Sequence, residues 1–446
     1  MKNMSPELKA CFLHMPVCTA VFFALACLTA ELLPLQYLYG APDVICFALC
    51  GTVIFAAALA MLKSLGIAPP GRHFYFAASF TALALILRFT MFDIASGDYN
   101  SFLVEWVSQL RDAGGTEGLA LEIGNYNTPY MFILWLISKS DMLDLYLIKF
   151  VSSFFDVLLA FFCAKLVPLK ADGRNILTIV FFTVLYLPTV VSNSAWWAQC
   201  DSIYVSLALG GLYFFLRGKG YAGSLLMAAS LCFKLQAVFI FPVLLVLLAL
   251  GIAKVRHLLV MPVVYLISIS PALLAGRDFS SVFMIYFSQL DEYEDLSLNC
   301  PNIYSLFMNY SSEALASAGL VAGFVFAAAV TVLMMENRRF LDTHLILKGA
   351  FLISFGLILI LPHMHERYSY LSDILIIAVA ASERKYIKAA VALQLCSLLS
   401  YLWFLCESYP ISFEYLALLR IAILLYMCAE YYSTLTRKSI FKPHKV

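Results

Sequence analysis

Runs of 18 or more apolar residues recur along the whole 446-residue chain, and they limit what it can fold into more than any single motif does. A run of this length can cross the ~30 Å hydrocarbon core of a membrane as one helix. Hydrophobic residues make up 63% of the chain and charged residues 13%, a balance that excludes a water-soluble globule with a polar surface. Because lipid offers the backbone no hydrogen-bond partner, the spans must be helical. The sequence therefore predicts an all-α, polytopic membrane bundle.

About fourteen spans are expected from these runs, at residues 11–33, 42–62, 74–92, 145–165, 175–191, 200–216, 221–233, 235–250, 257–275, 316–335, 343–361, 369–381, 387–406 and 413–433. Two places test the count. The segment 130–138 is too short to span and is expected to be an interfacial or re-entrant helix. The run 221–250 holds Lys234 near its middle, and burying that charge in one span would cost at least ~2.5 kcal/mol. A hairpin of two short helices, with Lys234 and Gln236 at its tip, is expected instead.

The loops between these spans alternate in charge. One set is basic and includes Lys63, Arg72, Lys170, Arg217, Lys254 and Arg338, together with the chain ends. The stretches 93–128 and 276–315 each carry six acids and one base. By the positive-inside rule, both termini lie in the cytoplasm and the acidic loops face outward. The overall balance of 29 Lys and Arg against 28 Asp and Glu gives no reason to expect nucleic acid as a partner.

Three parts of the chain follow from this topology. An N-terminal pair of spans covers residues 1–73. A central membrane core at 74–381 carries the outer loops 93–144 and 276–315, the first of which holds the interfacial helix. A C-terminal pair of spans and a basic cytoplasmic tail fill 382–446.

Polar motifs collect at the outer ends of the predicted spans. They are "FDIASGDYNSFLVEW", "NYNTPY", "SNSAWWAQCDSIY", "CFKLQ", "CPNIY" and "LPHMHERYSYLSD". A polar site on one side of a helical bundle suggests chemistry at a membrane surface, whereas a transporter more often places paired charges near the midplane. Ordinary roles also fit single residues, because an outer-loop Asp is often only solvated, Asp201 could cap a helix, and Trp196 and Trp197 could belong to an aromatic belt.

The motif "HMHERY" allows three interpretations. His363, His365 and Glu366 could bind a metal, although no thiolate or third histidine stands nearby. The same residues could simply end a span at the interface. Arg367 and a histidine could instead clamp an anion, since a guanidinium offers a fixed fork of donors. The clamp is favoured, with Lys234 as a second positive charge.

Most of the twelve cysteines lie inside apolar runs, where a thiol behaves as a small hydrophobe. Only Cys200 and Cys300 fall outside the expected membrane core. A disulfide between these two is therefore conceivable.

In combination and order, these motifs resemble the GT-C superfamily of integral membrane glycosyltransferases. Within it they look most like bacterial relatives of the mannosyltransferase that adds the second mannose of GPI anchors. The resemblance covers residues 75–380. It implies an enzyme of a bacterial plasma membrane that moves a hexose, with mannose favoured, from a polyprenyl phosphate to an acceptor hydroxyl on the outer face, with inversion.

The resemblance also implies roles for individual residues. Asp98 matches the catalytic base, with Asp93 as the alternative, and Asp201 looks like a residue that orients a substrate. Arg367, His365 and Lys234, with His363 beside them, look like the grip on the donor phosphate. The remaining polar and aromatic residues of the motifs are expected to bind substrate, and they are Asn127, Tyr130, Trp197, Gln199, Gln236, Asn302, Tyr304 and Glu366.

General chemistry supports the same assignment. Glycosyl transfer needs a base near the attacking hydroxyl and stabilisation of charge on the leaving group. A lipid monophosphate carries less charge than a nucleotide diphosphate, so Arg and Lys can suffice; a divalent metal is possible but not required. The acceptor could be a glycan, a lipid or a protein. The alternative function is a polytopic transporter or flippase for a sugar or lipid phosphate, which would show inverted repeats and broken spans.

Overall fold

A computed structural model describes residues 5–33, 35–168, 174–288, 294–307, 312–408 and 410–441. The described chain is mostly helical and has very few residues in strands, which confirms the predicted all-α class. Its two short strands, β1 (Ser297–Leu298) and β2 (Met364–His365), pair in parallel. The predicted basic residues Lys170, Lys442 and Lys445 lie outside the described ranges.

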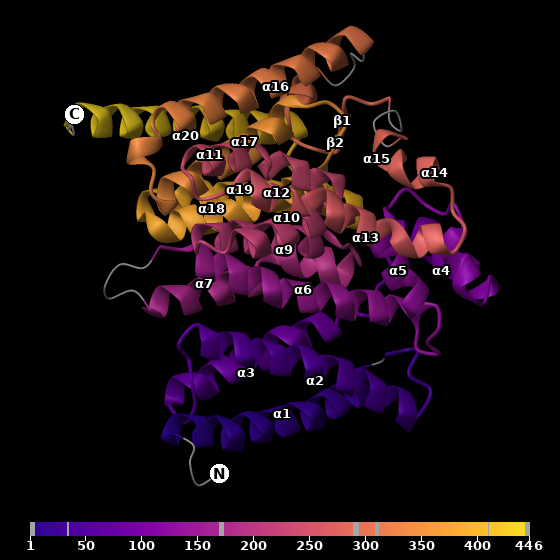
Figure 1. The fold of residues 1–446 in the computed structure, drawn as a ribbon. Helices are drawn as coiled ribbons and strands as arrows, with labels where there is room; N and C mark the ends of the chain where they lie inside the picture. The colour runs from indigo at the N-terminus through magenta and orange to yellow at the C-terminus, as the bar shows by residue number, and fades with distance from the viewer. Residues whose placement is uncertain are drawn as a thin grey trace.

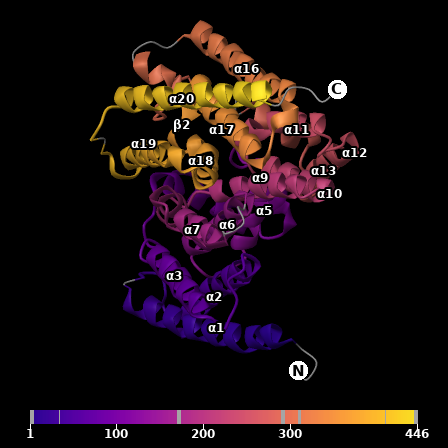
Figure 2. The same ribbon diagram turned by 90° about the vertical axis from the view of Figure 1, so that its left-hand side faces the viewer.

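The helices stack in layers from one terminus to the other (Figures 1 and 2). The N-terminal layer contains α1 (Pro6–Leu32), α2 (Ala41–Ser64) and α3 (Arg72–Phe89). The middle contains α6 (Asp144–Leu166), α7 (Arg174–Tyr186), α8 (Pro188–Val191), α9 (Asp201–Leu216), α10 (Gly220–Phe233), α18 (Tyr370–Ser382) and α19 (Ile387–Cys406). The far layer contains α11 (Pro242–Ala249), α16 (Glu313–Glu336), α17 (Thr343–Ile360) and α20 (Phe413–Phe441).

Shorter helices fill the connections. On the right of Figure 1 lie α4 (Val104–Asp112), α5 (Thr128–Ile137), α14 (Phe279–Phe283) and α15 (Ile285–Ser288), and α12 (Val255–Leu258) leads into α13 (Val260–Leu274). Two segments are π-helical, η1 (Tyr99–Leu103) and η3 (Ser192–Trp196). The 3₁₀ turns are η2 (Thr116–Ala120), η4 (Leu235–Ile240), η6 (Ile303–Phe307), η7 (Arg338–Phe340), η8 (Glu366–Ser369) and η9 (Arg384–Tyr386).

Seven helices in the described residues are long and apolar enough to cross a membrane, and up to eight if a bent pair counts as one span. The bent pair joins Asn175–Tyr186 to Pro188–Trp196 at an angle of 47°. These helices support a membrane protein. Helices occupy all fourteen predicted segments, but several, such as Asp201–Leu216 and Gly220–Phe233, are shorter than 18 residues. The count of fourteen spans therefore stays a prediction.

The chain reverses direction at Lys234, as the hairpin hypothesis predicted. Lys234 has an extended backbone between α10 and η4. Beyond α11 the chain comes back to the start of α10, where the ring of His257 contacts that of Tyr221 at a centroid distance of 4.8 Å. Lys234 thus lies at the end of the hairpin opposite Tyr221.

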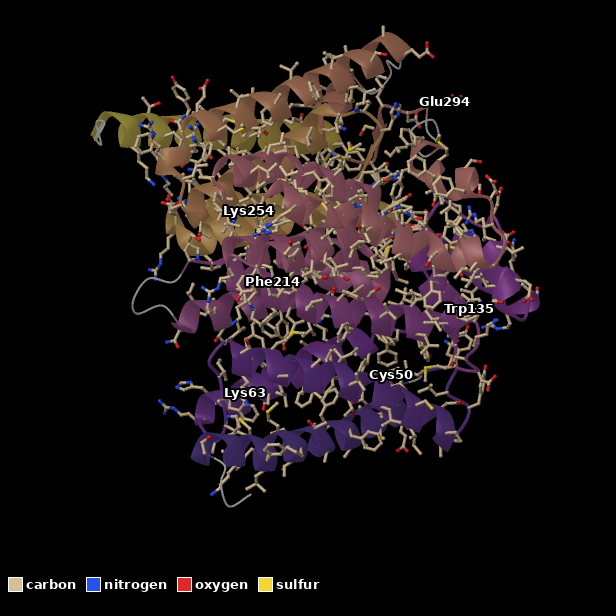
Figure 3. The ribbon with its side chains drawn as sticks, in the orientation of Figure 1. Cys50, Lys63, Trp135, Phe214, Lys254 and Glu294 are labelled. Carbon is tan, nitrogen blue, oxygen red and sulfur yellow. The ribbon has the colours of Figure 1, made fainter. Side chains whose placement is uncertain are left out.

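Basic and acidic loops lie at opposite sides of the layered stack. In Figure 3 the labelled Lys63 and Lys254 lie on the left, whereas Trp135 and Glu294 lie on the right. Both lysines come from loops that the sequence assigned to the basic set, and Glu294 comes from an acidic one. The positions of these three charged residues agree with the alternation of loop charge along the sequence.

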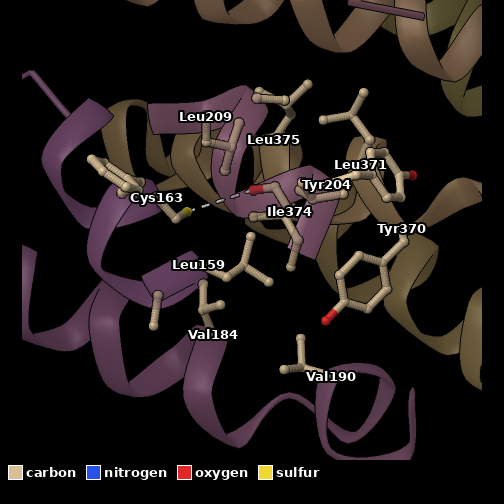
Figure 4. Packing of buried hydrophobic residues seen from close by; sticks show 14 of the residues in the cluster. Leu159, Cys163, Val184, Val190, Tyr204, Leu209, Tyr370, Leu371, Ile374 and Leu375 are labelled. Carbon is tan, nitrogen blue, oxygen red and sulfur yellow. Dashed lines mark hydrogen bonds between the residues drawn. The ribbon is translucent and has the colours of Figure 1, made fainter. Parts of the chain in front are cut away.

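A buried ion pair joins the N-terminal layer to the middle of the molecule. Arg88 of α3 and Asp156 of α6 are both fully buried, with Arg88 Nη2 2.9 Å from Asp156 Oδ2. Arg88 also donates to the carbonyl oxygen of Leu185, and the hydroxyl of Ser194 donates to Asp156. Beside this pair, apolar side chains from α6, α7, α9 and α18 interlock, and the thiol of Cys163 donates to the carbonyl oxygen of Ile374 (Figure 4).

Removing one partner of this pair should destabilise the bundle. We expect Asp156→Ala to lower the free energy of unfolding by roughly 3–5 kcal/mol, because it leaves the Arg88 charge buried and uncompensated. The matched control is Lys438→Ala, which removes a solvent-exposed pair with Asp342 worth less than about 1 kcal/mol. Thermal unfolding of the purified variants in detergent measures both. Equal loss in the two variants would contradict the role assigned to the buried pair.

Candidate functional site

One cavity of about 1010 Å³ gathers motifs that are far apart in the sequence. Its walls come from η1 and α4, the 124–130 segment, the turn before α9, the hairpin tip at 233–239, α16 and the 361–368 loop. Ten residues predicted for the site line this cavity, namely Asp98, Asn127, Tyr130, Gln199, Lys234, Gln236, His363, His365, Glu366 and Arg367. The cavity is therefore the candidate functional site.

Asp98 is held at the cavity wall by three donors. Its Oδ2 accepts hydrogen bonds from Trp197 Nε1 at 3.0 Å and from Gln199 Nε2 at 2.5 Å, and it lies 3.6 Å from Arg367 Nη1. Within the described part of the chain, all three contacts use Oδ2. Oδ1 is therefore left to accept a hydrogen bond or a proton from a ligand.

The backbone around Asp98 explains why two donors converge on one oxygen. Ala198 adopts a left-handed conformation with φ of 62°, rare for a residue with a side chain, and it turns Trp197 and Gln199 toward the same carboxylate. Ser96 donates to the carbonyl oxygen of Trp197 at 2.7 Å and accepts from the amide of Tyr99. These bonds fix the acidic loop against the start of α9. Strained backbone of this kind is typical of functional sites.

Arg367 is shared between two carboxylates. Its Nη1 donates to Glu366 Oε1 at 3.1 Å and also faces Asp98, and its guanidinium carbon lies 5.4 Å from the ring centroid of Trp197. Glu366 is buried, and its Oε2 has no hydrogen-bond partner among the described residues. Burial raises the pKa of Glu366 to about 7, against the lowering effect of Arg367. The charge on this carboxyl therefore depends on pH near neutrality.

The two histidines of the motif have different surroundings. His365 lies in β2 beside β1, and burial together with the charges of Arg367 and Lys234 lowers its pKa to about 2. Its imidazole is therefore neutral and can offer a hydrogen bond, but not a charge, to an anion. His363 Nδ1 contacts the carbonyl oxygen of Asp295 at 2.8 Å, and its backbone amide donates to Leu296. His363 thus also ties the 361–368 loop to the second acidic loop.

Asp201 and Lys234, which the sequence treated as separate functional groups, form an ion pair with each other. Lys234 Nζ lies 2.5 Å from Asp201 Oδ1, and Asn193 Nδ2 donates to Asp201 Oδ2 at 2.9 Å. Asp201 is fully buried and does not line the cavity, whereas Lys234 does. The positive charge of Lys234 is therefore largely compensated before any ligand binds.

Besides Asp201 and Trp197, three more predicted residues lie outside the cavity lining and make structural contacts, namely Asp93, Asn302 and Tyr304. Asp93 accepts hydrogen bonds from the hydroxyl of Tyr146 and from the backbone amide of Gln36. Asn302 Oδ1 accepts from the amide of Tyr304, whose hydroxyl donates to the carbonyl oxygen of Ile360 at 2.8 Å. Asp98 rather than Asp93 is therefore the carboxylate that a ligand in the cavity can reach.

The conceivable disulfide does not form in this structure, because Cys200 and Cys300 are both free and buried. Cys300 instead lies 3.7 Å from Arg420 Nη1. The described residues contain no group of three or more His, Cys, Asp or Glu side chains arranged to hold a metal ion. His363, His365 and Glu366, which suggested a metal set in the sequence, do not form one here.

Several residues that the sequence reasoning missed hold the site together. Arg420 of α20 donates to the carbonyl oxygen of Pro301 at 3.0 Å and to the hydroxyl of Ser369 at 2.5 Å, which links both loops to a C-terminal helix. Lys149 of α6 donates to three backbone carbonyls at the end of α3, those of Met91, Phe92 and Ile94. Each of these bases interrupts an apolar run, and a charge in a predicted span was the signal that could have revealed them.

The buried carboxyl of Glu366 gives a pH-dependent prediction. Its pKa is raised, so the folded state keeps a proton that the unfolded chain releases, and the free energy of unfolding should fall as pH rises from about 4.5 to about 7. Glu366→Gln mimics the protonated form, so the pH-dependent fall in its free energy of unfolding should be smaller than that of wild type by up to ~3 kcal/mol. Thermal unfolding of both proteins at about pH 5 and about pH 8 tests this, with Glu105→Gln as the exposed control. Parallel profiles for wild type and Glu366→Gln would contradict it.

Comparisons with known proteins do not assign this cavity. No protein-family model matches the chain. A search of the curated proteins finds no match either. What the protein does must therefore be argued from the residues around the cavity.

Proposed function

We propose that this protein is an inverting glycosyltransferase that moves a hexose, with mannose favoured, from a polyprenyl phosphate to an acceptor hydroxyl. The observation that carries the proposal is the meeting of Asp98 and Arg367 in one large cavity, with Nη1 and Oδ2 3.6 Å apart although the residues are far apart in sequence. A carboxylate with one unoccupied oxygen supplies a base, and a guanidinium supplies a site for a phosphate.

The contacts of Arg367 suggest how the two charges can serve one reaction. Asp98 and Glu366 are the anions that neutralise Arg367. A donor phosphate competes for the same guanidinium, and its binding frees Asp98 from the ion pair. Asp98 Oδ1 then accepts the proton of the attacking hydroxyl, while Arg367 and the neutral His365 stabilise the phosphate that leaves.

The cavity also has an apolar side that suits a lipid-linked donor. Leu320 of α16 and Val238 of η4 line it and are 55% and 41% exposed. Exposed apolar side chains of a membrane protein contact hydrocarbon at no cost, so a polyprenyl chain can remain in the membrane while its phosphate reaches Arg367. The polar and apolar walls of one cavity thus match the two ends of such a donor.

The proposal includes the membrane arrangement. We place the cavity on the outer face of a bacterial plasma membrane, with both termini in the cytoplasm, because acidic loops surround it and basic loops lie on the opposite side. A GT-C-like fold of about fourteen spans, with residues 74–381 as its catalytic core, fits this arrangement. Arg367 and His365 carry the phosphate interactions, so the reaction as proposed requires no metal.

Loss of the base is the sharpest test of the proposal. We expect Asp98→Asn to reduce transfer from a radiolabelled polyprenyl-phosphate hexose to an acceptor extract by ~10²–10⁴-fold, because the amide cannot accept the proton. Glu105→Gln is the matched control, since Glu105 is an exposed acid of the same loop and lies outside the cavity. The folded fraction of Asp93→Asn should also transfer sugar at the rate of wild type. Undiminished transfer by Asp98→Asn would contradict the proposal.

Loss of the phosphate site gives a second test. Arg367→Ala should lower transfer by roughly 10²-fold or more, since no other side chain replaces its fork of donors. The control is Arg111→Ala, which removes a half-exposed arginine that pairs with Asp144. The transporter alternative is tested in the same preparation. Movement of the sugar lipid across proteoliposomes, without any transfer of sugar, would support that alternative and contradict the proposal.

A further inference from the structure

A row of aromatic rings forms a wall of the cavity that the proposed chemistry does not use. Phe102, Trp106, Tyr126 and Tyr130 all line the cavity. Neighbouring ring centroids lie 5.9 Å apart from Phe102 to Trp106, 5.9 Å from Trp106 to Tyr126 and 4.7 Å from Tyr126 to Tyr130. Exposure falls along the row, from 50% at Phe102 to 3% at Tyr130. The rings therefore form a path from the surface toward the buried end of the cavity.

The backbone is shaped to hold the second ring of this row. Gly124 adopts a left-handed conformation with φ of 64°, and a Cβ added there would lie within 3.0 Å of three atoms of the Trp106 indole. Only glycine lets the loop come this close to the face of the ring. The indole is thus fixed in place rather than free to rotate out of the wall.

A polar group without a partner lies beside the aromatic row. Gln236 is 8% exposed and lines the cavity, and its Oε1 is buried with no hydrogen-bond partner among the described residues. It stands two positions after Lys234, whose Nζ lies 5.9 Å from the ring centroid of Tyr126. An unpaired buried acceptor is unfavourable. Because the residue lines the cavity, a half-turn of the amide about its last bond brings the oxygen to the cavity, where a ligand hydroxyl can donate to it.

We propose that Trp106, Tyr126 and Gln236 form a carbohydrate-binding subsite, so that the acceptor of the transfer reaction is a glycan. A pyranose has a face of C–H groups that packs on an aromatic ring and a rim of hydroxyls that donate to an amide oxygen. An acyl or polyprenyl chain could pack on the rings but would leave Gln236 Oε1 unpaired. The assignment of this sugar as an acceptor rests on the proposed glycosyltransferase function, whereas sugar binding itself does not.

Binding of a mannobiose to the purified full-length protein tests the subsite without any catalysis. Saturation-transfer NMR should detect binding to wild type, and Trp106→Ala should weaken it roughly tenfold, whereas Trp106→Phe retains most of it. Gln236→Ala should weaken binding as well. The control is Trp135→Ala, which should bind as wild type does, because Trp135 is an indole that lies outside the cavity. Thermal unfolding confirms that each variant is folded.

The outcomes separate this inference from the function on which it builds. The subsite would be overturned if folded Trp106→Ala and Gln236→Ala bound the mannobiose as wild type does. It would also be overturned if only a sugar-free polyprenol or a peptide, and not a sugar, bound at the aromatic wall. If the mannobiose binds through Trp106 but Asp98→Asn transfers sugar normally, the subsite stands and the proposed reaction fails. If Asp98→Asn is inactive and no mannobiose binds, the reaction stands and the subsite fails.

Discussion

A charge buried in a bundle that faces lipid must find its partner inside the protein, because hydrocarbon offers none. The fold of this chain follows that constraint at three levels. Arg88 and Asp156 join the N-terminal layer to the middle, and Lys234 and Asp201 join the hairpin tip to the start of α9. Arg420 joins the C-terminal helix to the segments at Pro301 and Ser369. Each link is a charge that would be costly if it were separated from its partner. The cavity lies at the second of these links, because Lys234 lines it.

The same constraint explains the charge balance at the cavity. Arg367 faces two carboxylates, and one of them, Glu366, is so buried that its pKa lies near 7. The Arg88 and Asp156 pair is enclosed in the protein, and in the Lys234 and Asp201 pair only Lys234 lines the cavity, but both members of the Asp98 and Arg367 pair line it. An added anion can therefore exchange with Asp98 at low cost, since the guanidinium keeps a charged partner throughout. This exchange connects donor binding to the availability of the base in the proposed reaction.

Sequence reasoning predicted the class of the fold and ten of the residues that line the cavity. Apolar runs predicted an all-α membrane bundle, and the cost of burying Lys234 in one span predicted the hairpin with Lys234 at its tip. The sequence could not decide whether Asp93 or Asp98 is the base, because both follow the same predicted span. The decision depends on tertiary contacts: Tyr146 donates to Asp93, whereas Trp197 and Gln199 donate to Asp98. The Asp201 and Lys234 pair was also hidden, because it depends on the spacing of α9 and α10. Of the aromatic wall, only Tyr130 was predicted to bind substrate. Phe102, Trp106 and Tyr126 lie in two of the outer-loop motifs, but the packing of the four rings in one row depends on how these two segments fold together.

The central claim is that a lipid-linked phosphate binds at Arg367 and displaces Asp98. An experimental structure of the protein with a bound polyprenyl phosphate tests this most directly. The account predicts phosphate density in contact with Arg367 and His365, the Asp98 carboxylate moved away from Arg367, and the lipid chain leaving between Leu320 and Val238. Phosphate density anywhere else, with the contact between Asp98 and Arg367 still in place, would contradict it.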